Sequence, residues 1–315
     1  MTHRSFLLAL GCIVTFASSS EAQSLNQDAM KSDLETVYNT WRQSMLRNNY
    51  EGWQAQTSTY RKVRVRNLAV SEKKPFPQSL FRKDIAPPSL MPLKYIGAVV
   101  KGSTAAATYF GKIDWGIGGQ PTENAYVLLF TKEKGVWKYD QARFFNLSHL
   151  PKVRDRLRNA DASVLHEQDG FQPSGTIPPV PPLCPAPQYI AKIFIDCQGR
   201  SVDATVNNVS SHHFEDMRDA EIISGGVHNG LNTVSLRFAD IQGKKQGSVA
   251  VMIYIMPETP GNYPGKTFEY IITGDKKPTN GQFSFTVTPE IIRKMSEKRL
   301  SKKPPVKVSA KEKSN

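Results

Sequence analysis

The residues best suited to acid–base or metal chemistry lie together in one short segment of the chain. His212 and His213 are followed closely by Glu215 and Asp216. Neighbouring histidines on a strand point to opposite faces of a sheet, so a strand could not present both to one metal ion. No further pair of histidines or cysteines at zinc-ligand spacing completes a set. The sequence therefore predicts a polar loop here, with no metal site and no bound cofactor.

The sequence lacks the usual motifs of covalent catalysis and phosphate binding. It contains no Gly-x-Ser-x-Gly, and its glycine-rich run at 116–119 joins two expected strands, whereas a phosphate loop leads into a helix. Cys184 and Cys197 are the candidates for a disulfide. An extended strand over 189–197 would leave them about 8 Å apart, beyond the roughly 7 Å that a disulfide spans. A disulfide therefore requires a bent or shorter strand; the alternative is a buried Cys197 and a free Cys184.

The N-terminal segment is typical of a secretory signal peptide. A basic residue precedes an apolar run at 6–17, and Ser20 and Ala22 place small residues before a cleavage site. The apolar run is too short to span a bilayer. We therefore expect residues 1–22 to be removed and the protein to be exported to the periplasm or secreted. A lipid anchor at Cys12 is the weaker alternative.

The remaining chain divides at residues 166–188, which are rich in proline. Proline fixes φ and removes a backbone donor, so this stretch favours an extended linker. Residues 23–165 show helical patterns followed by four strands. Residues 189–290 alternate apolar and polar side chains over six clear strands, with a possible seventh at 221–223.

The chain carries a net charge of +13, and much of the excess lies at its C-terminus. Residues 291–315 contain nine Lys and Arg against two Asp and Glu, which predicts a disordered basic tail. Such a tail could tether the protein to an acidic surface, such as anionic lipid or acidic glycan. It contains no aromatic residue to stack on bases, so nucleic acid is not an expected partner. The mature chain has no apolar run long enough for a transmembrane span.

Helical stretches near 27–47 and 50–66 precede four expected antiparallel strands between residues 93 and 147. The last strand contains Gly135-Val136-Trp137-Lys138-Tyr139-Asp140, which resembles the common last strand of the nuclear transport factor 2-like (SnoaL-like) superfamily. The resemblance implies an α+β cone, in which helices pack on a curved antiparallel sheet around a cavity, and a homodimer formed through the outer sheet face. For residues 189–290 the alternation predicts an all-β sandwich of generally immunoglobulin-like architecture.

The resemblance implies that ligand-binding residues line the cavity of the cone. Strict alternation would place Gln141 and Arg143 on the same face of the last strand as Trp137 and Tyr139, and Arg143 could then meet an anionic ligand. The candidates for the site are Trp53, Tyr109, Trp115, Tyr126, Gln141 and Arg143. The alternative is that the aromatic side chains fill the core.

Three functions are consistent with these residues. The preferred one is an exported, non-catalytic protein that binds a small molecule or another protein, because no complete catalytic set is present. The second is a cone-fold enzyme of the isomerase or cyclase type with Asp114 or Asp140 as base; Gln141 stands where the superfamily commonly has a histidine, which argues against it. The third is carbohydrate binding by the β-sandwich at an exposed aromatic platform. The candidates for this platform are Phe194, Tyr254 and Tyr263.

Overall fold

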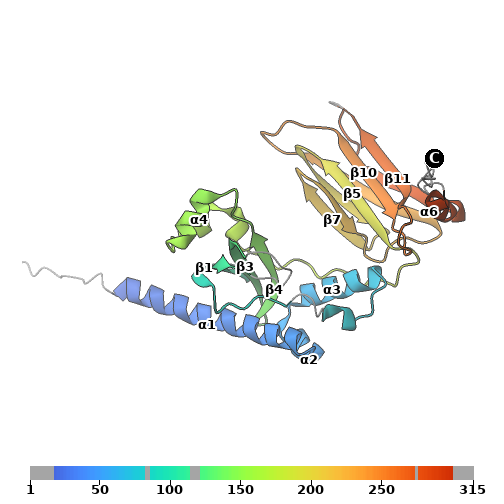
Figure 1. The fold of residues 1–315 in the computed structure, drawn as a ribbon. Coiled ribbons are helices and arrows are strands. Elements are labelled where there is room, and N and C mark those ends of the chain that lie inside the picture. Colours follow the sequence, from blue (N-terminus) through green and yellow to red (C-terminus); the bar gives the residue numbers. More distant parts are fainter. Residues whose placement is uncertain (1–17, 82–85, 114–120, 274–275, 301–315) are drawn as a thin grey trace, which may run out of the picture. The chain divides into compact units, whose positions relative to one another are not determined.

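The computed structural model describes residues 18–81, 86–113, 121–273 and 276–300. These residues form six α-helices and three antiparallel sheets of four strands each, so the protein is of mixed α/β class (Figure 1). Most of the predicted signal peptide and the end of the predicted basic tail lie outside the described residues.

The backbone contacts divide the chain into two units. The first unit comprises residues 1–58 and 82–178, and the second comprises residues 59–81 and 179–315. The last point of division falls inside the proline-rich segment 166–188. The helix α3 (Thr59–Ser71) was expected in the first domain, which was predicted to span residues 23–165. It belongs instead to the second unit, although it precedes the sheet of the first unit in the chain.

The first unit is built on one four-stranded antiparallel sheet whose strands follow chain order. These strands are β1 (Lys94–Lys101), β2 (Thr104–Lys112), β3 (Glu123–Glu133) and β4 (Val136–Phe145). The helices of this unit are α1 (Ser18–Leu46), α2 (Tyr50–Gln56), α4 (Pro151–Arg158) and α5 (Val164–Glu167), followed by a 3₁₀ turn at Asp169–Phe171. Helix α1 begins ahead of the predicted cleavage site after Ala22.

One face of this sheet packs against the apolar stripe of α1. Leu34 and Tyr38 of α1 are fully buried, and Trp41 packs beside them one turn further on. Their partners on the strands include Leu128, Phe130, Tyr139, Tyr109 and Tyr126. Aromatic rings therefore form much of the packing between α1 and the sheet.

The opposite face is covered by the segment that follows β4. Leu157, Leu165 and Phe171 from this segment are buried against residues of β1 to β3. Because both faces are covered, β2 and β3 are apolar and buried along most of their length instead of alternating. The sheet face that the family resemblance would use for a homodimer is thus occupied by residues 151–171 of the same chain.

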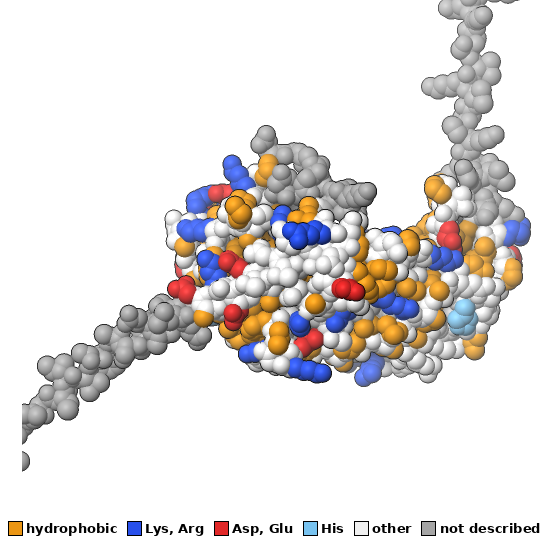
Figure 2. Space-filling model, turned by 90° about the horizontal axis from the view of Figure 1, so that it is seen from below, with side chains coloured by type: hydrophobic (Ala, Val, Ile, Leu, Met, Phe, Trp, Pro, Cys, Tyr) orange, Lys and Arg blue, Asp and Glu red, His pale blue; other side chains and the backbone are white. Residues whose placement is uncertain are grey.

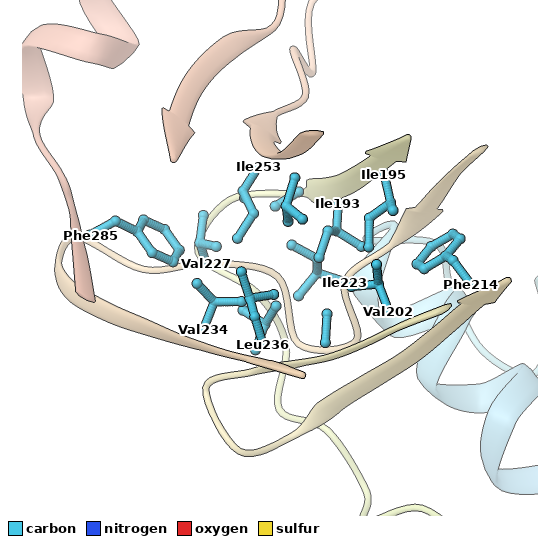
Figure 3. Packing of buried hydrophobic residues seen from close by; sticks show 14 of the residues in the cluster. Ile193, Ile195, Val202, Phe214, Ile223, Val227, Val234, Leu236, Ile253 and Phe285 are labelled. Atoms are coloured by element: carbon cyan, nitrogen blue, oxygen red, sulfur yellow. The ribbon is translucent and has the colours of Figure 1, made fainter. Parts of the chain in front are cut away.

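The second unit contains two four-stranded sheets, with strand orders β11-β10-β5-β8 and β12-β9-β6-β7. The strands are β5 (Ala191–Cys197), β6 (Arg200–Val206), β7 (Ser210–Glu215), β8 (Arg218–Ile222), β9 (Gly230–Asp240), β10 (Val249–Ile255), β11 (Gly265–Ile272) and β12 (Gly281–Val287). Inward residues of both sheets, such as Ile193, Ile253, Val202 and Leu236, share one apolar core (Figure 3). Each buried aliphatic side chain of this kind contributes roughly 1.5–3 kcal/mol to folding.

Helix α3 is fixed to the second unit by polar contacts with the chain that follows the proline-rich segment. The Asn67 amide donates to the Pro182 carbonyl oxygen (2.8 Å) and accepts from the Cys184 backbone N–H (3.1 Å). The Ser71 hydroxyl oxygen accepts from the Gly225 N–H at 2.8 Å. A short 3₁₀ turn at Gln78–Leu80 follows the helix.

The predicted disordered tail begins with an ordered helix, contrary to expectation. Helix α6 (Pro289–Leu300) buries Met295 and packs Ile291 and Ile292 against the core between the two sheets. These apolar residues are spaced as one face of a helix, which the basic composition of the segment concealed. Only residues 301–315 of the predicted tail lie outside the described part of the chain.

Lys and Arg side chains of the described residues are spread among apolar and uncharged side chains on the face shown in Figure 2. In the described part of the chain, no helix has both the length and the apolar character needed to cross a bilayer.

Candidate functional site

The aromatic residues predicted to line a cavity in the first unit are packed in its interior. Tyr109 is 1% exposed, and its hydroxyl donates to Glu35 of α1 at 3.1 Å. The Tyr126 hydroxyl lies 3.3 Å from that of Tyr38.

Trp53 is buried and stacks on Tyr50 with a ring-centroid separation of 5.6 Å. The last aromatic candidate, Trp115, lies outside the described residues.

Tyr38 is the centre of this aromatic packing. Its hydroxyl donates to the Pro88 carbonyl oxygen at 2.8 Å, and the Arg42 guanidinium one turn later donates to the Pro87 carbonyl at the same distance. Burial raises the pKa of Tyr38, Tyr109 and Tyr126 above the ordinary tyrosine value. These phenols are therefore neutral hydrogen-bonding groups at physiological pH.

A β-bulge in β4 changes which side chains face α1. Leu129 of β3 pairs with Gln141, and the next residue, Phe130, pairs with Tyr139, so Asp140 is an extra residue. One extra residue reverses the alternation beyond it. The prediction that Gln141 and Arg143 share a face with Tyr139 is therefore wrong.

Beyond the bulge, Arg143 lies opposite Val127, which belongs to the core on the α4 side of the sheet. Its guanidinium donates to the Gly170 carbonyl at 3.3 Å. The bulged Asp140 is buried and accepts a hydrogen bond from the Ser58 hydroxyl at 2.6 Å. Both groups therefore fasten neighbouring segments of the first unit. The other candidate base, Asp114, lies outside the described residues.

The residues predicted to form an aromatic platform on the second unit are only partly available. Tyr254 points outward from β10, as its position in the alternation predicts, but its hydroxyl contacts the Met252 sulfur at 3.2 Å. Phe194 is half-buried, and the Arg218 guanidinium carbon lies 5.2 Å from its ring centroid. Tyr263 is exposed in the chain between β10 and β11.

The candidate disulfide is not formed, since Cys184 and Cys197 are both free and buried. Cys184 lies beside Asn67 and Ser71 of α3. Cys197 points into the core from β5, and burial raises the pKa of its thiol. The alternative of two separate thiols thus fits the structure.

A polar pocket of about 440 Å³ lies in the second unit, where α3 and strands β6 to β9 contribute side chains. We call it the polar pocket. Its lining residues are Tyr60, Arg64, Asp203, Thr205, Ser211, His212, His213, Glu221 and Arg237.

The buried wall of the polar pocket is a hydrogen-bonded relay that joins β7 to β8. The Ser210 hydroxyl lies 2.7 Å from Nε2 of His212, and Nδ1 of His212 lies 2.7 Å from a Glu221 carboxylate oxygen. This histidine bond, helped by the charge of Arg64, lowers the pKa of Glu221. An ionised Glu221 accepts from Nδ1–H, which leaves Nε2 to accept from the serine hydroxyl.

This relay has the bonding order of a serine hydrolase triad, but the serine is closed off. Ser210 is 2% exposed and does not line the polar pocket. Its hydroxyl oxygen also accepts from the Ser224 N–H at 2.7 Å. A nucleophile must reach the substrate carbon, so this arrangement holds two strands together and positions His212 as a wall of the pocket.

The exposed wall of the polar pocket is formed by side chains on the outer face of the β6–β7–β9 sheet. Asp203 is the register partner of His213 on one side and of Arg237 on the other. The Asp203 carboxylate lies 2.7 Å from Nδ1 of His213. Among the residues that the structure describes, the exposed Arg237 guanidinium has neither an ion-pair nor a hydrogen-bond partner.

The remaining lining groups are hydroxyls and a second guanidinium. The hydroxyls of Thr205 and Ser211 are 3.4 Å apart on neighbouring strands. Arg64 of α3 donates to the Tyr60 hydroxyl at 2.9 Å, with its guanidinium carbon 6.0 Å from that ring's centroid. Within the described ranges, no cluster of three or more His, Cys, Asp and Glu side chains could hold a metal ion.

Sequence reasoning missed the polar pocket because it interpreted β7 as a polar loop. The strand is present, and the expectation that adjacent histidines face opposite sides of a strand is confirmed: His212 is buried and His213 exposed. Asp203 and Arg237 stand at outward positions of strands that alternation does identify. A signal was thus present, but the register between strands is needed to join these residues.

Comparison with protein-family models, with curated proteins and with solved structures gives no match.

Proposed function

We propose that this protein is an exported, non-catalytic binding protein whose polar pocket takes a small anionic ligand. The observation that carries the proposal is Arg237, which lines a concave polar surface without a partner among the described residues. A guanidinium in this situation forms charge-assisted hydrogen bonds with carboxylate or phosphate. Arg64 adds a second positive charge to the same pocket.

Binding is a better interpretation of these groups than turnover. The serine of the Ser210–His212–Glu221 relay is buried, and its hydroxyl is hydrogen-bonded to both His212 and the Ser224 N–H. Asp140, the candidate base of a cone-fold enzyme that the structure describes, is held by Ser58. Both groups stabilise the fold in this proposal, and the ligand contacts other side chains.

The experiment is calorimetric titration of the full chain with inorganic phosphate and with acetate. We expect measurable binding of at least one anion, and roughly 10- to 100-fold weaker binding by Arg237→Gln, since a charged hydrogen bond is lost. Arg218→Gln is the matched control, because Arg218 is an exposed arginine of the same unit outside the pocket. Equal loss in both variants, or no binding by the unaltered protein, would refute the proposal.

The fold assignments that resemblance suggested are part of the same proposal. The order of β1 to β4, with α1 on one face, supports a nuclear transport factor 2-like cone for the first unit. Two sheets around one core support an immunoglobulin-like sandwich for the second. In this proposal the first unit is a scaffold, because aromatic rings pack between α1 and its sheet.

Export and contact with an acidic surface complete the proposal. N-terminal sequencing of the exported protein should begin at Gln23; retention of residues 1–22 would contradict the signal peptide. Because of the basic segment 291–315, the protein should co-sediment with vesicles of anionic lipid and not with vesicles of zwitterionic lipid. Sedimentation that is unchanged when residues 301–315 are removed would argue against this contact.

A further inference from the structure

We infer that the ligand of the polar pocket is a hydroxylated carboxylic acid of the sugar-acid class. Its carboxylate would bind Arg237, and its hydroxyls would bind Asp203, Thr205 and Ser211. The inference rests on the proposed function and adds the chemical class of the ligand.

The first reason is that the polar pocket offers acceptors as well as donors. A carboxylate has about four lone-pair positions, and the histidine bonds recorded at Asp203 and at Glu221 each use one of them. A simple inorganic anion presents mainly acceptors, so it would satisfy Arg237 and leave these carboxylates facing negative charge. A ligand that combines an acid with hydroxyls satisfies both kinds of group.

The second reason is that two guanidiniums, those of Arg64 and Arg237, line the same pocket as the carboxylates. Asp203 is bonded to His213, and Glu221 is bonded to His212 and lies in the field of Arg64. Both guanidiniums would repel a ligand ammonium, whereas a neutral hydroxyl needs only a hydrogen-bond acceptor. This favours hydroxyls over the amino group of an amino acid.

The third reason is the placement of the side-chain hydroxyls. Thr205 and Ser211 present two hydroxyls 3.4 Å apart, on the same two strands as the Asp203–His213 pair and two residues along from it. Each hydroxyl can donate or accept, so the pair suits neighbouring hydroxyls on one ring. Tyr60 lines the pocket on the α3 side. The volume, about 440 Å³, lies in the range of small-molecule sites.

The test compares three probes that differ by one feature: glucuronate, glucose, and cyclohexanecarboxylate, which has the ring and the acid without the hydroxyls. Affinities are measured by calorimetric titration of the full chain. We expect glucuronate to bind roughly tenfold or more tightly than either of the others, since several neutral hydrogen bonds add to the charged one.

Variants assign the contacts. Thr205→Val combined with Ser211→Ala should weaken glucuronate about 2- to 10-fold per lost hydrogen bond and leave cyclohexanecarboxylate unchanged. Arg237→Gln should weaken both acids. Ser284→Ala, an exposed serine of β12 outside the pocket, is the control. Circular dichroism of each variant confirms that it is folded.

The outcomes separate the inference from the proposed function. If cyclohexanecarboxylate binds as tightly as glucuronate, and both depend on Arg237, the pocket binds acids but the sugar-acid class is wrong. Glycine is titrated in the same way; if it binds more tightly than glucuronate, the ligand class is zwitterionic and the inference is also wrong. If no acid binds, the proposed function fails together with the inference.

Discussion

Arg237 and Asp203 lie directly opposite each other on neighbouring strands, yet the Asp203 carboxylate is bonded to His213 on its other side. Opposite charges in register normally pair. His213 therefore competes with Arg237 for this carboxylate, and the competition leaves the guanidinium available to a ligand.

Removal of His213 should weaken anion binding without touching the arginine. In His213→Ala, Asp203 is free to pair with Arg237, and we expect the affinity for cyclohexanecarboxylate to fall about 2- to 5-fold, in line with an exposed ion pair of up to ~1 kcal/mol. Asp203→Ala in the same background should restore the affinity. A double variant no better than His213→Ala would show that the histidine acts directly on the ligand.

Asp240 is a surface residue whose loss should be unusually costly. Its carboxylate pairs at 2.8 Å with Arg200, which is 2% exposed, while Asp240 itself is 48% exposed. Asp240→Ala leaves a buried guanidinium held mainly by the Gly247 carbonyl, so we expect a loss of about 3 kcal/mol in the free energy of unfolding, measured by urea denaturation. Asp196→Ala, which removes a 3.9 Å contact to exposed Arg218, should cost under about 1 kcal/mol. Equal costs would contradict this account.

The Tyr38 hydroxyl should be important for the stability of the first unit. Tyr38→Phe leaves the Pro88 carbonyl without its buried donor, which costs about 1–3 kcal/mol of unfolding free energy. Tyr189→Phe is the control, because its hydrogen bond to Asn229 is exposed. A cost for Tyr38→Phe no larger than that of the control would mean that ring packing alone holds α1.

Alkaline pH should weaken the first unit through Tyr95. Burial, followed by the charges of Glu35 and Asp28, raises the pKa of Tyr95 to about 12. The pKa of an unfolded tyrosine is about 10, so the contribution of this group to stability is present below about pH 10 and is lost as the pH rises through about 12. The difference between the phenolate absorbance titrations of the unaltered protein and Tyr95→Phe should show one group ionising near pH 12. Ionisation near pH 10 would show that the hydroxyl is open to water.

The strands of the second unit were predictable wherever one face is apolar. In β5 and β10 every second residue is buried, and their alternation identifies them from sequence alone. Strand β7 was not predicted from the sequence, because Ser210 and His212 occupy inward positions that apolar residues usually fill. Their burial depends on Glu221, which belongs to a different sheet, and this partner is not visible in the local pattern.

The bulge at Asp140 marks another limit of local patterns. Alternation assumes two residues per repeat, and a single extra residue moved Gln141 and Arg143 to the other face. The bulge is a property of the pairing between β3 and β4, so the sequence of β4 by itself does not reveal it. Helix α6 is the opposite case, because its local sequence does contain the apolar stripe of a helix. The basic composition of the segment led instead to the prediction of a disordered tail.

Helix α3 makes the second unit discontinuous in sequence, because the chain passes between the units at residues 58/59, 81/82 and 178/179. Cleavage or recombination within the proline-rich segment would leave α3 on the wrong fragment. The fragment after the cut would lack Tyr60 and Arg64, and Cys184 would lose its cover of Asn67 and Ser71. The two units are therefore not exchangeable modules, and a gene must carry both of them together for the second unit to be complete.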